Sequence, residues 1–482
     1  MNELRNDRHL SVHDLRRRIN EGDIDTVVVA FTDMQGRLQG KRMHAVYFAE
    51  HVLEHGTEGC NYLLAVDIEM NTVEGYAISS WDRGYGDFEF QLDLQTIRLL
   101  PHQPGAAMVQ CDLVWLDHSP VRQSPRTILQ AQLDRVADRG LVALAGTELE
   151  FIAFHTSYED AARQRYHDLV PVNAYNVDYS ILGGARAEPL LREIRNTMYA
   201  AGMDVESAKG ECNFGQHEIG FLYADVLTTA DNHAVYKTVA KEIAAQQGRS
   251  ITFLAKYNER EGSSCHIHLS LRGADGSTVF WSSDRPDEGG LDPTEQAEGE
   301  RSRSPRSSPR SGSRSRLYDH FVAGLLATMT DFTLLYAPNV NSYKRFTPGS
   351  FAPTTVAWGT DNRTCAVRLV GQGSSARLEN RVPGADVNPY LALAAMLAGG
   401  LHGIENELEL GPELTGNAYA SGLPTVPRTL RDAREAWSGS AVARAAFGHD
   451  VVDHYTNMAD VELAAFDAAV TDWELHRGFE RM

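Results

Sequence analysis

The segment TELEF carries two glutamates that could bind a cation together. Glu148 and Glu150 are two residues apart, and on a β-strand this spacing points both side chains to the same face. Glu-x-Glu pairs are also common at solvated strand edges. Here the flanking residues, among them Leu149 and Phe151, are apolar, which favours an interior position. Because buried carboxylates repel each other unless a cation or protons offset their charge, the pair is a candidate metal site.

Three other segments carry residue types that ligate divalent metals. Glu211 and Glu218 lie in KGECNFGQHEIGF, His266 and His268 lie in CHIHLSL with the same two-residue spacing, and Glu379 lies in ARLENR. Either histidine alone would more often be a hydrogen-bonded core residue than a ligand. Several carboxylates with one imidazole suit Mg²⁺ or Mn²⁺ better than zinc. The combination predicts a binuclear site for hard metal ions.

Arginines are concentrated in the segments that follow. NSYKRFTPGSFAP places one arginine beside a Pro-Gly turn, and the group consists of Arg345, Arg363, Arg368, Arg377 and Arg381. Any one of them could belong to a solvated basic face. Together with acids and histidines, their guanidinium groups suit carboxylates and phosphates. Phosphoryl transfer requires mainly metal ions and cationic groups around the moving phosphate, so the residues fit that reaction.

Composition limits the class of protein. The chain has 482 residues, a hydrophobic fraction of 43%, a charged fraction of 23% and a formal charge of −20. Such an acidic chain is not expected to bind nucleic acid, and no stretch reaches the roughly 18 to 20 apolar residues of a membrane span. The charged N-terminus is unlike a signal peptide, and five cysteines without paired spacing fit reduced thiols. We therefore expect a soluble cytoplasmic protein.

Two domains are expected to position the candidate residues. Residues 1–108 predict a small α+β domain, in which Ser11 begins a helix and residues 25–33 form a strand. Residues 109–482 predict a larger α+β catalytic domain, because strands alternate with long helices. Its expected strands span residues 141–154, 251–257 and 266–271, and its expected helices span residues 126–137, 229–247 and 317–336 and a buried segment that begins at Asn388-Pro389.

Residues 283–316 interrupt this order. The second half, RSRSPRSSPRSGSRSR (Arg301–Arg316), is of low complexity and contains no apolar residue. Such a segment cannot bury enough apolar surface to offset the entropy cost of ordering it. We expect a disordered surface loop there, and a nucleic-acid-binding or phosphorylated tail is the alternative.

Taken in order, six blocks resemble the signature motifs of the glutamine synthetase superfamily. These blocks are TELEF, GECNFGQHE, HIHLSL, NSYKRFTPG, NRTCAVR and RLENR…NPYLALAA. The resemblance implies an N-terminal β-grasp-like domain and a catalytic domain with a curved antiparallel sheet and surrounding helices. It also implies an ATP-dependent carbon–nitrogen ligase with two or more Mg²⁺ or Mn²⁺ ions per site. The homo-oligomer implied is a double-ring dodecamer with active sites between neighbouring subunits.

The resemblance also implies a role for each matching residue. Glu150, Glu211 and Glu218 match ligands of a first metal near the substrate glutamate, and Glu148, His266 and Glu379 match ligands of a second metal near the ATP phosphates. The remaining matches are glutamate-binding Gly262, Arg345 and Arg381, nucleotide-contacting His268, Ser270 and Arg368, and the phosphate-steadying catalytic pair Arg363 and Arg368. The implied reaction forms γ-glutamyl phosphate, from which an amine displaces phosphate.

Two departures from the family pattern concern that amine. Ammonia-using members carry a glutamate in the flap where this chain has Phe351, and an N-terminal aspartate where it has the segment Cys60–Leu63. Loss of both acids favours an organic amine such as ethanolamine, a polyamine or an alkylamine, with Phe351 and Tyr62 as walls of the amine site. Ammonia-dependent glutamine synthesis remains an alternative. A catalytically silent structural or regulatory oligomer is another, although all six implied metal ligands are present.

Overall fold

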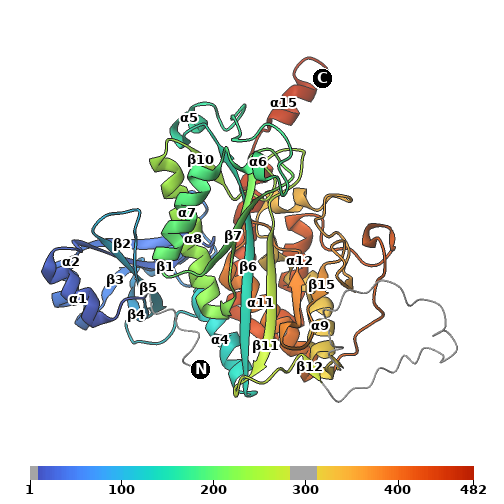
Figure 1. Ribbon diagram of the computed structural model, residues 1–482, viewed down its shortest axis with the longest axis horizontal. Coiled ribbons are helices and arrows are strands. Elements are labelled where there is room, and N and C mark those ends of the chain that lie inside the picture. Colours follow the sequence, from blue (N-terminus) through green and yellow to red (C-terminus); the bar gives the residue numbers. More distant parts are fainter. Residues whose placement is uncertain (1–8, 283–311) are drawn as a thin grey trace.

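The computed structural model describes residues 9–282 and 312–482. The N-terminal part is built on a five-stranded sheet, drawn in blue at the left of Figure 1. The strand order is β2 (Leu38–His44), β1 (Thr26–Thr32), β5 (Ala106–Val114), β4 (Asp87–Leu99) and β3 (Thr57–Cys60). β1 and β5 are parallel and the other pairs are antiparallel. Because β5 crosses the expected boundary at residue 108, the N-terminal sheet extends to Val114.

Helix α1 (Val12–Glu21) begins where the sequence predicts. The Ser11 hydroxyl oxygen accepts a hydrogen bond from the Asp14 backbone N–H, which satisfies one of the free donors at the helix start. Gly22 ends the helix with a φ of 81°, a conformation that suits glycine. The buried Leu15 and Ile19 hold the helix against the N-terminal core.

A nine-stranded sheet forms the centre of the second part. Its main path runs β14 (Trp358–Thr360), β15 (Val367–Val370), β16 (Arg377–Asn380), β11 (Cys265–Gly273), β6 (Leu141–Phe154), β8 (Gln216–Phe221) and β7 (Val205–Gly210). β9 (Ala224–Asp225) and β10 (Ser250–Thr252) also pair with β6. Apart from the parallel β14–β15 pair the strands are antiparallel. The long strands β6 and β11 stand side by side in the middle of Figure 1.

Helices surround this sheet. They include α4 (Pro125–Ala137), α7 (Glu188–Ala200), α8 (Val226–Gln246), α11 (Pro389–Glu405), α12 (Leu430–Gly439) and α14 (His449–Ala468). Helix α11 is buried along nearly all its length, as its apolar sequence predicts. Within the described ranges, no helix combines the length and apolar character that crossing a membrane requires. The structure therefore has the α+β fold that the resemblance implied, with a curved sheet and surrounding helices.

Two elements differ from the expectation. The apolar segment at residues 251–257 pairs with β6 only as far as Thr252; beyond it, the Lys256 backbone N–H donates to the Asn341 side chain instead of a strand. The helix expected over residues 317–336 is two helices, α9 (Arg316–Ala327) and α10 (Met329–Tyr336). At the break, the Thr328 hydroxyl donates to the Gly324 carbonyl, and such bonds to the preceding turn bend helices.

The end of the expected 283–316 loop has structure. Residues 283–311 lie outside the described ranges, but β13 (Ser313–Arg314) pairs with β12 (Trp281–Ser282), and α9 begins at Arg316. The Arg314 side chain donates to Asp319 at 2.9 Å and its guanidinium lies 4.8 Å from the ring of Trp358. An ion pair and an aromatic contact thus hold Arg314, near the end of the low-complexity segment.

Candidate active site

Strand register brings the predicted acids and histidines together. Glu148 on β6 lies opposite His266 on β11, and Glu150 lies opposite Glu218 on β8. On the other side of β11, His268 lies opposite Glu379 on β16. Since alternate residues share a face of a strand, four neighbouring strands present these side chains on one face of the curved sheet.

One group of carboxylates consists of Glu150, Glu211 and Glu218. One oxygen of each lies within 4.8 Å of the others. Glu150 Oε2 accepts hydrogen bonds from the Ser264 backbone N–H at 2.8 Å and from Gln216 Nε2 at 2.9 Å. Lys209, which the sequence did not point to, forms an ion pair with Glu211 and lies 3.7 Å from Glu218. A cation therefore already lies beside these three acids.

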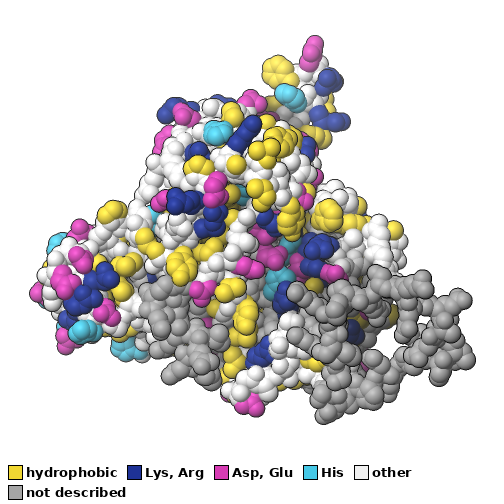
Figure 2. Space-filling view, in the orientation of Figure 1, with side chains coloured by type: hydrophobic (Ala, Val, Ile, Leu, Met, Phe, Trp, Pro, Cys, Tyr) yellow, Lys and Arg dark blue, Asp and Glu magenta, His cyan; other side chains and the backbone are white. Residues whose placement is uncertain are grey.

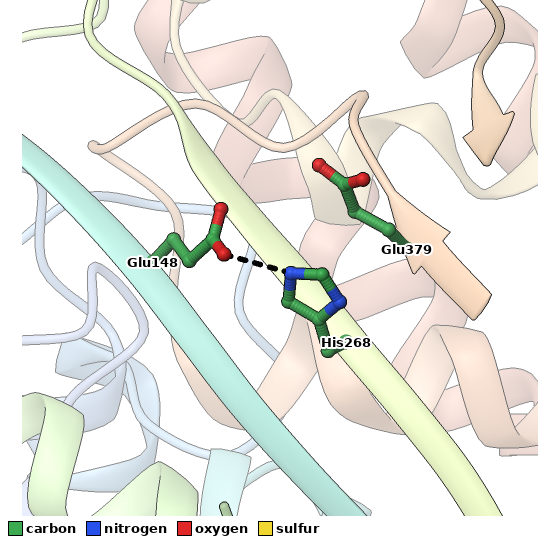
Figure 3. A group of neighbouring side chains, drawn as sticks. All are labelled: Glu148, His268 and Glu379. Carbon is green, nitrogen blue, oxygen red and sulfur yellow. Dashed lines mark hydrogen bonds and ion pairs between the residues drawn. The ribbon is translucent and has the colours of Figure 1, made fainter. Parts of the chain in front are cut away.

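The second group lies one strand further along the sheet. Figure 3 shows Glu148, His268 and Glu379 from β6, β11 and β16, with side chains on the same side of the strands. Their ligand atoms lie within 4.8 Å of one another, and His268 Nε2 is 2.9 Å from Glu148 Oε1. His266, the histidine predicted as a ligand, lies somewhat farther away, since its Nδ1 is 3.4 Å from Glu148 and 3.6 Å from Glu379. Both histidines therefore face the two acids.

Burial, hydrogen bonds and nearby charges shift the pKa values of the acids and histidines in both groups. It raises the pKa of Glu218 to about 8, despite the opposing effect of Lys209. Burial would also raise the pKa of Glu148, but hydrogen bonds with His266 and His268 hold it below its usual range. Burial, followed by the nearby positive charge of Arg381, lowers the pKa of His266 to about 4. The site thus combines a neutral imidazole with acids that need a positive charge beside them.

These residues fit divalent metal ions. Both groups offer several carboxylate oxygen atoms, and the second group also offers an imidazole nitrogen. Such ligands match hard cations such as Mg²⁺ and Mn²⁺. His266 Nε2 is buried and has no hydrogen-bond partner. Its other ring nitrogen faces two carboxylates, so the imidazole is held in place to act as a ligand.

The arginines divide into different environments. Glu379, which is 1% exposed, pairs with Arg381 and accepts a hydrogen bond from Arg368 at 2.8 Å. Arg345 is also buried, and it donates to the carbonyl oxygens of Val382 at 2.7 Å and Arg381 at 2.8 Å. Arg363 is exposed and lines the cavity described next.

A cavity of about 290 Å³, the active-site cavity, opens over both groups. Among the predicted residues that line it are Glu148, Glu150, Glu211, Glu218, Gly262, His266, Phe351, Arg363, Arg368, Glu379 and Arg381. A neighbouring cavity of about 690 Å³ shares Glu148 and Glu218 and is lined by His268 and Ser270, the predicted nucleotide contacts. Figure 2 shows acidic, basic and histidine side chains gathered in a hollow over this part of the sheet. Most of the predicted site residues thus surround two adjoining spaces.

Arg345 lies behind this lining. A Cβ at position 262 would come within 2.7 Å of Arg345 Cγ, so the arginine packs directly against Gly262. Arg345 is thus placed to hold the backbone of the cavity wall at Gly262, while its Nε remains without a hydrogen-bond partner.

The two aromatic residues predicted at the amine site lie apart in this chain. Phe351 lines the active-site cavity, is 58% exposed, and has a φ of 60°. Tyr62 belongs to a 3-10 turn, Asn61–Leu64, of the N-terminal part, where its ring lies 6.4 Å from Tyr85. In the described part of the chain, Tyr62 lines neither of the two cavities.

Other lining residues had no signal in the sequence. They are Asp178, Tyr179, Lys209, Cys212, Gln216, Glu261, Ser264 and Ser350. Most come from loops between strands, and no periodic spacing marks them. Gln216 and Ser264 could have been suspected, because they lie beside predicted ligands in GQHE and GSSCH.

Comparisons with known proteins agree with this geometry. Residues 122–293 and 305–478 match the family described as glutamine synthetase, catalytic domain. The chain is 60% identical to gamma-glutamylethanolamide synthetase of Streptomyces coelicolor over 98% of its length and 96% of the relative, and 34% identical to glutamate–isopropylamine ligase of a Pseudomonas species over 96% of both. The solved structure of GmaS with ADP covers 97% of the chain and is itself covered to 99%, with a TM-score of 0.79 and 26% identity. The chain therefore belongs to the glutamine synthetase family, as an ATP- and metal-dependent ligase that joins a nitrogen donor to glutamate.

Proposed function

We propose that this ligase joins ethanolamine to the γ-carboxylate of L-glutamate. The observation that carries the proposal is the 60% identity, over nearly the whole of both chains, to an enzyme named for γ-glutamylethanolamide synthesis. The structure supports an organic amine, because an aromatic residue, Phe351, lines the active-site cavity at the flap position where ammonia-using relatives carry an acid.

The active-site residues fit a two-step reaction. Mg²⁺ or Mn²⁺, held by Glu150, Glu211 and Glu218 and by Glu148, His266 and Glu379, would neutralise charge on the ATP phosphates and the attacking carboxylate. A γ-carboxylate oxygen of glutamate attacks the γ-phosphorus of ATP, and ADP leaves. The amine nitrogen then attacks the carbonyl carbon, a C–N bond forms, and the C–O bond to phosphate breaks. The amine, which is an ammonium ion at neutral pH, loses one proton before it attacks and a second one afterwards, which completes the amide.

Arginine side chains of the chain would bind the transferring phosphate and the substrate glutamate. Arg368 and Arg363 point from the β14–β15 region toward the cavity, where guanidinium groups suit a transferring phosphate. Arg368 is held in place by Asp361 at 3.0 Å and by Glu379 at 2.8 Å. Arg381 and Gly262 line the part of the cavity beside Glu150, where we place the glutamate.

The proposal includes a double-ring dodecamer in the cytoplasm. Tyr62, Trp81 and Tyr85 form an aromatic cluster on the N-terminal part, with ring centroids 6.4 Å and 5.0 Å apart. Trp81 is 72% exposed, so this cluster is available to cover the active-site cavity of a neighbouring subunit. All five cysteines are free, in keeping with a reducing compartment.

The decisive experiment measures phosphate release from ATP with glutamate, Mg²⁺ and a panel of acceptors, with product masses checked. The panel contains ethanolamine, ammonium, putrescine, isopropylamine and methylamine. We expect ethanolamine to give the highest kcat/KM. Ammonium as the best acceptor would make the chain a glutamine synthetase with an unusual flap, and a polyamine would reassign the substrate. Turnover with none of them would favour a catalytically silent oligomer.

A further inference from the structure

Glu261 is an acid of the active-site cavity that neither metal group uses. It lines the same cavity as Phe351, Ser350 and Asp178. Its Oε2 is buried and has no hydrogen-bond partner. It forms a long ion pair with its neighbour Arg260, with a distance of 3.8 Å between Nε and Oε2. The guanidinium of Arg260 stacks on the ring of Phe214 at 4.1 Å, which limits how far it can follow the carboxylate.

The other acids of this cavity have partners of their own. Glu150 accepts two hydrogen bonds, and Glu211 is paired with Lys209. Asp178 is exposed and lies 3.7 Å from the Cys212 thiol, which donates to it. Among the described acids that line this cavity, Glu261 is the one with a buried carboxylate oxygen that accepts no hydrogen bond.

The backbone around Glu261 is tied to the strand that carries the metal-binding acids. Asn213 Nδ2 donates to the Glu261 carbonyl at 2.7 Å, and Gln216 Nε2 donates to the Gly262 carbonyl at 2.9 Å. Gln216 also donates to Glu150. These bonds hold the Glu261 backbone next to Gly262, where we place the substrate glutamate.

A primary alkylamine is protonated at neutral pH, as a lysine side chain is, and it enters the site as an ammonium ion. Binding that ion requires an acceptor of hydrogen bonds with negative charge. We propose that Glu261 binds the ammonium group of the acceptor amine, with Phe351 against its carbon atoms, and so replaces the flap acid of ammonia-using relatives. This assignment rests on the proposed amine ligase activity, and it makes Glu261 a specificity-determining residue for cationic acceptors.

The test compares Glu261→Gln with Glu259→Gln. Glu259 lies on the same loop, is exposed and does not line the cavity, so its substitution makes the same charge change outside the site. Each protein is assayed at pH 7 with ethanolamine, which is a cation, and with hydroxylamine, which is neutral. We expect Glu261→Gln to lower kcat/KM for ethanolamine about 10-fold to 100-fold, as for loss of one hydrogen bond to a charged group. The KM values for glutamate and ATP and the rate with hydroxylamine should stay near those of the wild type.

Several results would overturn the assignment. One is a Glu261→Gln protein that uses ethanolamine as well as Glu259→Gln does. Another is an equal loss with ethanolamine and hydroxylamine, which would indicate a structural role. A Glu261→Asp variant keeps the charge and should retain the preference for ethanolamine over hydroxylamine, so losing that preference would also count against it. If the wild type fails with ethanolamine and every other organic amine, the amine ligase proposal itself fails, and Glu261 has no such acceptor to bind.

Discussion

Gly262→Ala should impair glutamate binding through Arg345. A Cβ at this position would lie 2.6 Å from the Ala255 carbonyl oxygen and 2.7 Å from Arg345 Cγ. Ordinary van der Waals contact begins at 3.4 Å, so the arginine must give way by about 0.7 Å (3.4 − 2.7) and the Ala255 carbonyl by about 0.8 Å (3.4 − 2.6). The extra methyl group alone should lower the unfolding free energy by about 1–3 kcal/mol, as other substitutions that overpack a filled interior do.

The effect on activity follows from the bonds that hold Arg345. Its hydrogen bonds to the Val382 and Arg381 carbonyls are 2.7 and 2.8 Å long, so a shift of that size would bring them close to the limit of hydrogen bonding. Arg381 also pairs with Glu379, which couples the shift to the metal-binding acids. Misplacement by about 1 Å can cost about 100-fold in rate, and we expect a rise of about 10-fold or more in the KM for glutamate.

The assay is steady-state kinetics with glutamate and ATP varied separately, together with thermal unfolding. Gly439→Ala at the end of α12 is the control, because a Cβ there meets no atom within 4 Å. A Gly262→Ala enzyme with the wild-type KM for glutamate and the wild-type melting temperature would refute the reasoning. A raised KM for ATP alone would show that Arg345 does not support the glutamate site.

Local spacing predicted correctly which candidate metal ligands share a face of a strand. Glu148 and Glu150 share a face because they are two residues apart on one strand, and the same holds for His266 and His268. The spacing does not tell which strand lies beside which, so the pairing of β11 with both β6 and β16 could not be predicted from periodicity alone. The resemblance to a known family implied which residues belong to each metal group, whereas the strand order comes from the structure.

Some residues of the cavity escaped prediction. Glu261 reaches the cavity from the loop before β11 and Lys209 from strand β7, and neither belongs to a spaced set of acids or histidines in the sequence. The break at Thr328 was missed for a related reason. The apolar residues from 317 to 336 are compatible with one continuous helix. At the break, the Thr328 hydroxyl donates to the Gly324 carbonyl of the preceding turn, and such bonds bend helices.

Two further predictions test the metal site and the junction of the two domains. Glu379→Ala should abolish turnover while the proposed oligomer remains assembled, because it removes a proposed metal ligand and leaves Arg368 and Arg381 without their shared carboxylate. Near-normal phosphate release at saturating Mg²⁺ would contradict this. Burial lowers the pKa of His454 to about 3, where its Nε2 contacts Met34 Sδ at 2.8 Å. In the unfolded chain the pKa of this histidine is about 6.5, so below that pH the unfolded chain takes up a proton that the folded protein does not. The contribution of His454 to the unfolding free energy is therefore fully present above pH 6.5 and declines as pH falls toward 3. Between pH 7 and pH 5 the wild type should therefore lose about 2 kcal/mol more unfolding free energy than His454→Asn, measured by denaturant titration, and equal losses would show that His454 is not buried in its neutral form.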